Sequence, residues 1–150
     1  MPTPAHGYAA HSADTDLTPW SFERRDLRPD DIAIDILFCG VCHSDIHTAR
    51  SDWADEDYPV VPGHEIVGKV AEIGAEVTNY KVGDMVGVGC MVDSCQHCAA
   101  CSQDLEQYCA NDKTPTYGGF DQRDGSPTYG GYSSKIIVNE KFVLRIPEGL

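Results

Sequence analysis

The sequence has no apolar run approaching the roughly 20 residues of a membrane-spanning helix, so a membrane span is not expected. Basic residues are also scarce: 11 Lys and Arg stand against 24 Asp and Glu, for a formal net charge of −13. A chain this acidic repels nucleic-acid phosphates and anionic lipid surfaces, so neither is expected as a partner. The first residues lack the basic and apolar regions of a signal peptide. We therefore expect a soluble, cytoplasmic protein.

Aromatic residues make up only 9% of the 150 positions, whereas Gly (14) and Pro (9) are plentiful, and no long helical period is visible. This composition favours turns and short elements. Residues 31–39 alternate, with Ile32, Ile34, Ile36 and Phe38 on one face, which predicts a strand. A loose start is expected before this strand and a short helix after it, over 42–50. Further strands are expected at 63–74, 82–92, 132–138 and 142–146.

One short sequence is repeated. Pro-Thr-Tyr-Gly-Gly-Phe at 115–120 recurs as Pro-Thr-Tyr-Gly-Gly-Tyr at 127–132. Two copies of six residues are too few for a repeat architecture. We interpret them as turn segments that flank a loop.

A disulfide framework is not expected, because the seven cysteines are an odd number in a chain without an export signal. Four of them follow the pattern Cys95-x2-Cys98-x2-Cys101-x7-Cys109. Two-residue gaps let thiolates converge on one tetrahedral zinc, and four sulfurs leave no open position, so this site would be structural. The bacterial iron–sulfur pattern needs a three-residue gap and then Cys-Pro, whereas Ala110 follows here. Zinc is favoured, with iron–sulfur and unligated thiols as alternatives.

A second metal site is suggested by a thiol, an imidazole and a carboxylate on separate segments: Cys42, His64 and Glu65. Such ligands suit a zinc that keeps a position open for substrate. Each residue also has a simpler explanation, because a lone cysteine is most often buried as a small hydrophobe and a lone histidine is usually just hydrogen-bonded. The sequence contains no G-x-G-x-x-G dinucleotide fingerprint. Spacing alone therefore leaves the second site open.

Three motifs in order carry a resemblance to a known family: Cys39-Gly-Val-Cys-His-Ser-Asp-Ile-His47, then Pro62-Gly-His-Glu-Ile-Val-Gly68, then the four-cysteine pattern. Together they closely resemble zinc-dependent medium-chain alcohol dehydrogenases, nearest to the cinnamyl-alcohol-dehydrogenase-like branch. The resemblance covers nearly the whole chain. It implies a mainly β fold, a GroES-like partly open β-barrel with short helices and a zinc-knuckle loop.

The resemblance also implies roles for individual residues. Cys42 and His64 would bind a catalytic zinc, with Glu65 as an alternate ligand. Asp45 would orient His64, because metal-bound imidazoles commonly need such a partner. The remaining roles are a proton relay from the alcohol through the cofactor ribose to solvent (Ser44, His47), cofactor pyrophosphate binding (His43), a substrate pocket (Trp53, Cys90) and a structural zinc site (Cys95, Cys98, Cys101, Cys109).

The implied reaction is the interconversion of primary alcohols and aldehydes by hydride exchange with NADP or NAD. Family members carry a further cysteine ligand and a Rossmann cofactor domain, through which they dimerise, beyond where this chain ends. We therefore expect residues 1–150 to be the catalytic domain alone, with the Rossmann domain absent, an incomplete catalytic zinc site and no turnover in isolation. The alternatives are a standalone zinc-stabilised GroES-like binding module and a polyol dehydrogenase.

Overall fold

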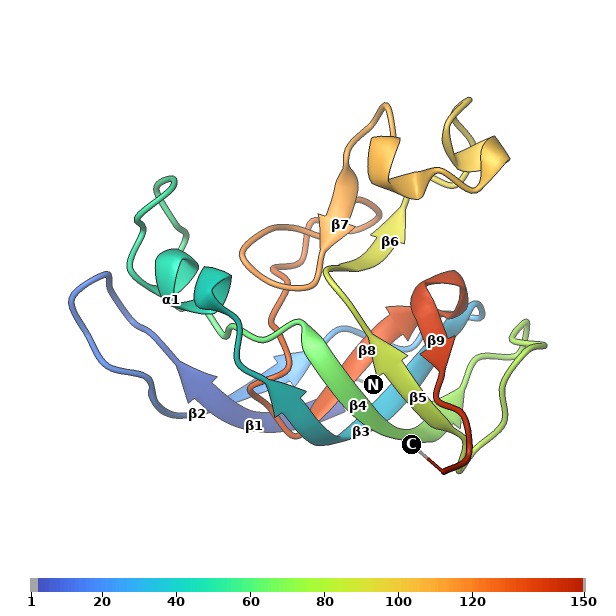
Figure 1. Cartoon of the computed structure of the whole chain (residues 1–150), viewed down its shortest axis with the longest axis horizontal. Coiled ribbons are helices and arrows are strands. Elements are labelled where there is room, and N and C mark those ends of the chain that lie inside the picture. Colours follow the sequence, from blue (N-terminus) through green and yellow to red (C-terminus); the bar gives the residue numbers. More distant parts are fainter. Residues whose placement is uncertain (1–2, 150) are drawn as a thin grey trace.

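The computed structural model describes residues 3–149 and has a mainly β architecture, as the sequence predicts. Its centre is one curled antiparallel sheet with the strand order β8-β3-β4-β5-β9 (Figure 1). The strands of this sheet are β3 (Asp31–Gly40), β4 (Glu65–Ile73), β5 (Met85–Val88), β8 (Lys135–Asn139) and β9 (Val143–Arg145). The strands expected at 31–39 and 63–74 and the two near the C-terminal end are thereby confirmed.

The main core is formed mostly by side chains of this sheet. It consists of buried β-branched residues, which suit a pleated surface: Ile32, Ile34, Ile66, Val70, Val86, Val88, Val92, Ile136, Val138 and Val143. Each side chain buried in this way contributes on the order of 2 kcal/mol to folding.

The alternation predicted for the first strand is correct at its start and wrong at its end. Ile32 and Ile34 are fully buried, but Phe38 is 71% exposed. The register between β3 and β4 shifts between Ile36 and Phe38, as it does at a β-bulge. An extra residue moves every later side chain to the other face, so Phe38 faces outward.

The prediction of a loose segment before the first strand is wrong. An antiparallel hairpin of β1 (Thr3–Ala9) and β2 (Thr18–Arg24) occupies this segment. β1 reads TPAHGYA, which offers no run of β-branched residues for a sequence pattern to detect. The hairpin is held by packing instead: Ala5 and Ala9 are buried against Phe22 and Val61 in a second, smaller core.

The expected helix is α1 (His43–Ala49). At seven residues it is far too short to cross a bilayer, and no other helix in the described range could do so. The single strand expected at 82–92 is two strands, because the chain bends at Gly89 and Cys90 between β5 and β6 (Met91–Ser94).

A separate lobe projects from the sheet beyond β6 (Figure 1). We call residues 95–112 the cysteine lobe. It contains the 3-10 turns η1 (Cys101–Gln103) and η2 (Glu106–Tyr108) and returns through β7 (Lys113–Pro115), which pairs with β6. A third 3-10 turn, η3 (Glu140–Phe142), precedes β9.

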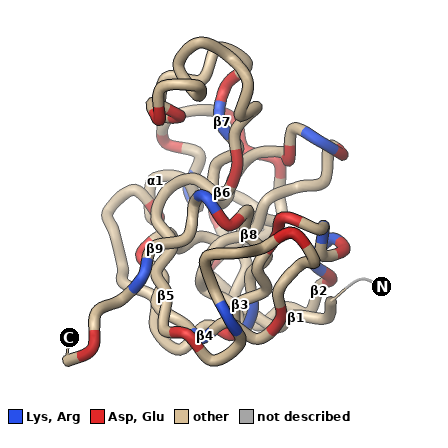
Figure 2. The backbone as a smooth tube through the Cα atoms, turned by 90° about the vertical axis from the view of Figure 1, so that its right-hand side faces the viewer, with Lys and Arg blue, Asp and Glu red and all other residues tan. Residues whose placement is uncertain are grey.

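Acidic residues are spread along the backbone of the sheet, the loops and the cysteine lobe (Figure 2). Several of them form an ion-pair network between the β2–β3 turn and the loop at 121–124. Arg28 pairs with Asp121 at 2.9 Å and Arg123 with Asp30 at 2.7 Å. The network ties segments that are more than 90 residues apart in sequence.

Candidate metal centres

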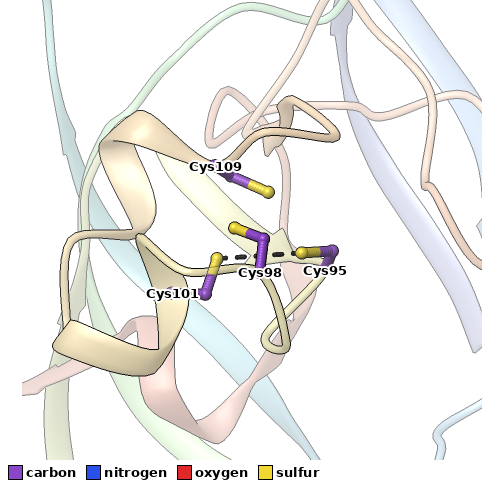
Figure 3. A group of neighbouring side chains, drawn as sticks. All are labelled: Cys95, Cys98, Cys101 and Cys109. Carbon is purple, nitrogen blue, oxygen red and sulfur yellow. Dashed lines mark hydrogen bonds between the residues drawn. The ribbon is translucent and has the colours of Figure 1, made fainter.

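The first candidate centre is the set of four cysteines in the cysteine lobe. Cys95 and Cys98 lie on the loop after β6, Cys101 begins η1, and Cys109 follows η2. Their sulfur atoms all lie within 4.8 Å of one another. Figure 3 shows the four side chains converging on a common point. The spacing in sequence therefore becomes a compact group of four thiols.

The geometry of this group fits a zinc ion. A tetrahedral ion with Zn–S distances of ~2.3 Å holds its sulfurs about 3.8 Å apart. The sulfurs of Cys95 and Cys101 are 3.9 Å apart, and all seven cysteines are free thiols. The backbone amides of His97 and Cys98 lower the pKa of the Cys95 thiol to about 5. This favours the thiolate, which is the form that binds metal.

The second candidate centre brings together residues from two distant segments. Cys42 precedes α1, His64 precedes β4, and Glu65 is the first residue of β4. Each of the three offers a ligand atom, and these atoms lie within 4.8 Å of one another.

Gly63 allows the chain to bring His64 into this group. Its φ of +102° is a left-handed conformation that glycine adopts readily. A Cβ at this position would lie 2.8 Å from the Cys39 sulfur and 2.8 Å from the Tyr132 backbone nitrogen. Both backbone conformation and close packing therefore require glycine beside the histidine.

Asp45 connects the two ligand-bearing segments. One carboxylate oxygen accepts a hydrogen bond from the Cys42 backbone N–H at 2.9 Å, and the other accepts one from the Gly63 N–H at 3.0 Å. The second oxygen also lies 3.4 Å from Nδ1 of His64. Burial alone would raise the pKa of Asp45, but these amides and the Tyr132 hydroxyl lower it, so the carboxylate stays charged. Asp45 therefore faces Nδ1 of His64 and leaves Nε2 for another partner.

An open cavity of about 270 Å³ adjoins the second centre. Ser44, His64, Cys90 and Tyr117 are among the residues that line it. One thiol, one imidazole and one carboxylate beside an open space form a ligand set that zinc accepts while leaving room for substrate. The residues present therefore fit a zinc ion.

The other residues singled out in the sequence lie around α1. Ser44 donates a hydrogen bond to the Cys42 sulfur at 3.1 Å. His47 pairs through Nδ1 with Asp52 at 2.8 Å, and its ring stacks on both His43 and Trp53, with centroids 5.0 and 4.7 Å away. Trp53 is 66% exposed, so its indole covers the outer face of the histidine pair.

Two tyrosines at the second centre were not predicted from the sequence as site residues. Tyr132 donates a hydrogen bond to Asp45 at 2.7 Å, and the Tyr117 hydroxyl lies 3.2 Å from Nδ1 of His64. Both belong to the repeated hexapeptide, which was the one sequence signal that pointed to this region. Their approach to Asp45 spans more than 70 residues of chain, so no local pattern could reveal it.

A comparison with protein families matches residues 28–148 to the alcohol dehydrogenase GroES-like domain. Among curated proteins, the chain is 57% identical over 144 residues to NADP-dependent alcohol dehydrogenase C 1 of Mycolicibacterium smegmatis, covering 95% of the chain and 41% of that protein. It is 50% identical over 149 residues to probable cinnamyl alcohol dehydrogenase 5 of Oryza sativa, covering 99% of the chain and 42% of that protein. The chain thus spans about two-fifths of the length of these relatives.

Among solved structures, CAD from Helicobacter pylori, complexed with NADP(H), superposes with a TM-score of 0.95 at 43% sequence identity. The match covers 99% of this chain and 43% of that one. The GroES-like fold expected from the resemblance is thereby confirmed.

Proposed function

Because the chain belongs to the alcohol dehydrogenase GroES-like domain family, we propose that it is the catalytic domain of a zinc-dependent, NADP-linked alcohol dehydrogenase that interconverts primary alcohols and aldehydes. The observation that carries this proposal is the convergence of Cys42, His64 and Glu65 beside an open cavity. A binding module stabilised by the cysteine lobe alone would need no second ligand set.

Cys42 and His64 hold the catalytic zinc, with Glu65 as the third or alternate ligand. The four cysteines of the cysteine lobe hold a structural zinc. When bound, the catalytic zinc supplies Lewis-acid polarisation of an alcohol or carbonyl oxygen. Asp45 keeps the proton of His64 on Nδ1, so that Nε2 is free to bind metal.

Two residues of α1 handle the proton of the reaction. In the oxidation direction, the alcohol gives up a hydride from carbon and a proton from its hydroxyl, and becomes an aldehyde. Ser44, at the cavity wall, takes this proton as it passes its own hydroxyl proton through the cofactor ribose to His47. His47 delivers it to solvent, because an imidazole can gain and lose a proton near neutral pH. Cys90 lines the cavity proposed for the substrate, and Trp53, which stacks on His47 outside this cavity, is proposed to contact the substrate at its outer end.

NADP is the proposed hydride acceptor, and His43 is proposed to contact its pyrophosphate. The name of the Mycolicibacterium relative and the complex of the Helicobacter CAD with NADP(H) support this choice over NAD. We assign dinucleotide binding and subunit pairing to the part of such enzymes that residues 1–150 do not span. All seven cysteines are free thiols, which persist in a reducing compartment, and this supports the cytoplasm.

A chimera tests the proposal. Residues 1–150 would replace the matching segment of the Mycolicibacterium enzyme, and NADPH-dependent reduction of aromatic and aliphatic aldehydes would be measured. We expect turnover in the chimera and a loss of at least a hundredfold in its Cys42→Ser variant, with the structural zinc retained in both.

Two results would contradict the proposal. A folded, zinc-loaded chimera without aldehyde reductase activity would refute the assigned reaction. Preferential oxidation of a polyol such as mannitol would replace the assigned substrate class with the polyol alternative.

A further inference from the structure

The two tyrosines on Asp45 have no role in the function proposed above. Tyr132 donates a hydrogen bond to one Asp45 oxygen at 2.7 Å. The ring of Tyr117 stacks on His64 with centroids 5.6 Å apart and planes inclined by 17°. Its hydroxyl lies 3.2 Å from Nδ1 of that histidine.

The hydrogen bonds around Asp45 favour the tautomer of His64 that carries its proton on Nδ1. Asp45 is 2% exposed and accepts from two backbone amides and the Tyr132 hydroxyl, while Nδ1 of His64 lies near its other oxygen. A carboxylate with these donors has little acceptor capacity left. The Tyr117 hydroxyl interacts with both Asp45 and Nδ1 of His64, so it can accept from Nδ1–H and donate to the carboxylate. The imidazole proton is thereby held on Nδ1.

The two hydroxyl groups, of Tyr117 and Tyr132, belong to the two repeated hexapeptides. The first copy, 115–120, and the second, 127–132, face each other across a loop: the Thr128 N–H bonds to the Gly119 carbonyl at 2.8 Å, and Phe120 bridges Pro127. The second copy also runs beside the segment that leads to His64. Its Gly131 N–H bonds to the Gly63 carbonyl at 2.8 Å, and its Tyr132 N–H to the Pro62 carbonyl at 2.9 Å. One loop therefore supports the histidine segment through its backbone and Asp45 through its side chains.

We propose that Tyr117 and Tyr132 are positioning residues of the second centre, which fix the Asp45 carboxylate and the His64 tautomer so that Nε2 is presented to the metal. This inference rests on the proposed function, because it takes Cys42 and His64 as metal ligands. It assigns to the loop at 115–132 a part in metal binding, although none of its residues is a ligand.

The test compares Tyr132→Phe and Tyr117→Phe with the matched control Tyr129→Phe in the full 150-residue chain. Tyr129 occupies the same place in the second copy as Tyr117 in the first, but its ring packs on Trp20 and Phe22. Zinc content of the cysteine lobe and thermal unfolding report whether each variant is folded.

The first measurement is cobalt(II) affinity. Cobalt is titrated into chains whose cysteine lobe already holds zinc, and the thiolate-to-cobalt band that disappears in Cys42→Ser reports the second centre. We expect Tyr132→Phe and Tyr117→Phe each to weaken cobalt binding about tenfold or more, as loss of a partner of a metal-bound histidine does. Tyr129→Phe should bind cobalt like the wild type.

The second measurement needs no metal at the second centre. Long-range proton–nitrogen NMR correlations give the tautomer of His64 directly. We expect the Nδ1–H form in the wild type and in Tyr129→Phe, and a mixture of tautomers in the other two variants.

The outcomes separate the two proposals. If both variants keep wild-type cobalt affinity and the Nδ1–H tautomer, the positioning role is refuted and the proposed function stands. If neither the 150-residue chain nor the chimera takes up more cobalt than its Cys42→Ser variant, the metal site itself is refuted, and both proposals fail with it.

Discussion

At the scale of single residues, Asp45 organises the second centre through several hydrogen bonds. It receives hydrogen bonds from the backbone beside Cys42 and from Gly63, and it faces His64. The relative placement of the two ligand segments thus depends on one buried carboxylate. The two segments that donate to this carboxylate, at Cys42 and at Gly63, are therefore expected to tolerate few substitutions.

Gly63→Ala should destabilise the protein by about 3 kcal/mol, because it adds left-handed backbone strain to a steric overlap in the core. The new Cβ would lie 2.8 Å from the Cys39 sulfur and 2.8 Å from the Tyr132 backbone nitrogen, and a backbone atom cannot easily move away. Urea unfolding measures the free energy, and cobalt titration measures the effect on the second centre.

Gly83→Ala is the matched control. Gly83 has a similar φ of +94°, but its Cβ would meet open space. It should cost only about 1 kcal/mol, from backbone strain alone. Equal losses in the two variants would show that packing around Gly63 contributes nothing.

The sequence identifies the candidate metal ligands better than their surroundings. Cys42, His64 and the four lobe cysteines stand out because their types and spacings are rare outside metal sites. Tyr117 and Tyr132 do not, because a tyrosine in a Gly-rich segment has no distinctive pattern. Only the three-dimensional structure brings their hydroxyls to Asp45 and His64.

At the scale of elements, the cysteine lobe has little apolar packing of its own. Its described side chains include the exposed Leu105 and Tyr108, and of its cysteines only Cys101 is buried. A loop of this kind gains much of its stability from the metal it binds. The five-stranded sheet, in contrast, has a continuous apolar core.

Removal of zinc with a chelator should therefore unfold the cysteine lobe and leave the sheet folded. Hydrogen exchange should show fast exchange over 95–112 and unchanged protection in β3 and β4. Cys98→Ser should show the same pattern without chelator, whereas Cys90→Ser, which lies outside the lobe, should retain its zinc. Global unfolding on chelation would contradict this separation.

Arg24 at the end of β2 holds the loop that carries Tyr132. Its guanidinium is buried and donates to the carbonyls of Tyr129, Gly130 and Lys135 and to the Ser133 hydroxyl. Burial lowers its pKa, which reflects the cost of placing a cation there. The hydrogen bonds to buried carbonyls offset this cost.

Arg24→Met should destabilise the chain by roughly 3 kcal/mol, because the Tyr129 carbonyl loses this donor and the Gly130 and Lys135 carbonyls are left to share the Ser133 hydroxyl. It should also weaken cobalt binding at the second centre, since the segment at 129–135 loses its anchor. Lys135→Met is the control: it removes one positive charge from a partly exposed side chain at the sheet surface and should change neither property by much. A similar loss in both variants would point to net charge as the cause.

The strands also show which structural features hydrophobic alternation in the sequence predicts and which it does not. The strand at 31–40 is predictable because Ile32, Ile34 and Ile36 recur at every second position, although Asp31 and Ala33 between them are buried as well. The outward turn of Phe38 is not, because a bulge depends on the pairing with β4. The β1–β2 hairpin is missed because its stability comes from contacts with Val61 and the aromatic cluster around Trp20.

At the scale of the whole molecule, a net charge of −13 coexists with a network of arginine–aspartate pairs. Hydrogen bonds from Arg123 lower the pKa of Asp30. Burial would raise the pKa of Asp121, but the hydrogen bonds from Arg28 and from the Arg123 amide outweigh burial and lower it. These pairs close the β2–β3 turn against the loop at 121–124.

The lowered pKa values fix the pH at which this stabilisation is lost. A carboxylate with a folded pKa below its unfolded value of 3.8 contributes its full stability above that value and loses it as the pH falls further. Arg123→Gln should thus cost roughly 2 kcal/mol at pH 7, between the values for exposed and buried pairs, and much less below pH ~3. Urea unfolding across this range measures the difference, and an equal cost at both pH values would contradict the linkage.

The path of β7 links the two metal centres. Lys113–Pro115 lies between Cys109 of the cysteine lobe and Tyr117, whose ring stacks on His64. The Thr116 N–H donates a hydrogen bond of 3.1 Å to the Cys90 carbonyl at the bend between β5 and β6. When the cysteine lobe holds no metal, this segment is held at Cys90 but no longer at Cys109. Under zinc scarcity, an emptied lobe would therefore loosen the segment that carries Tyr117, and the second centre would depend on the first for its shape.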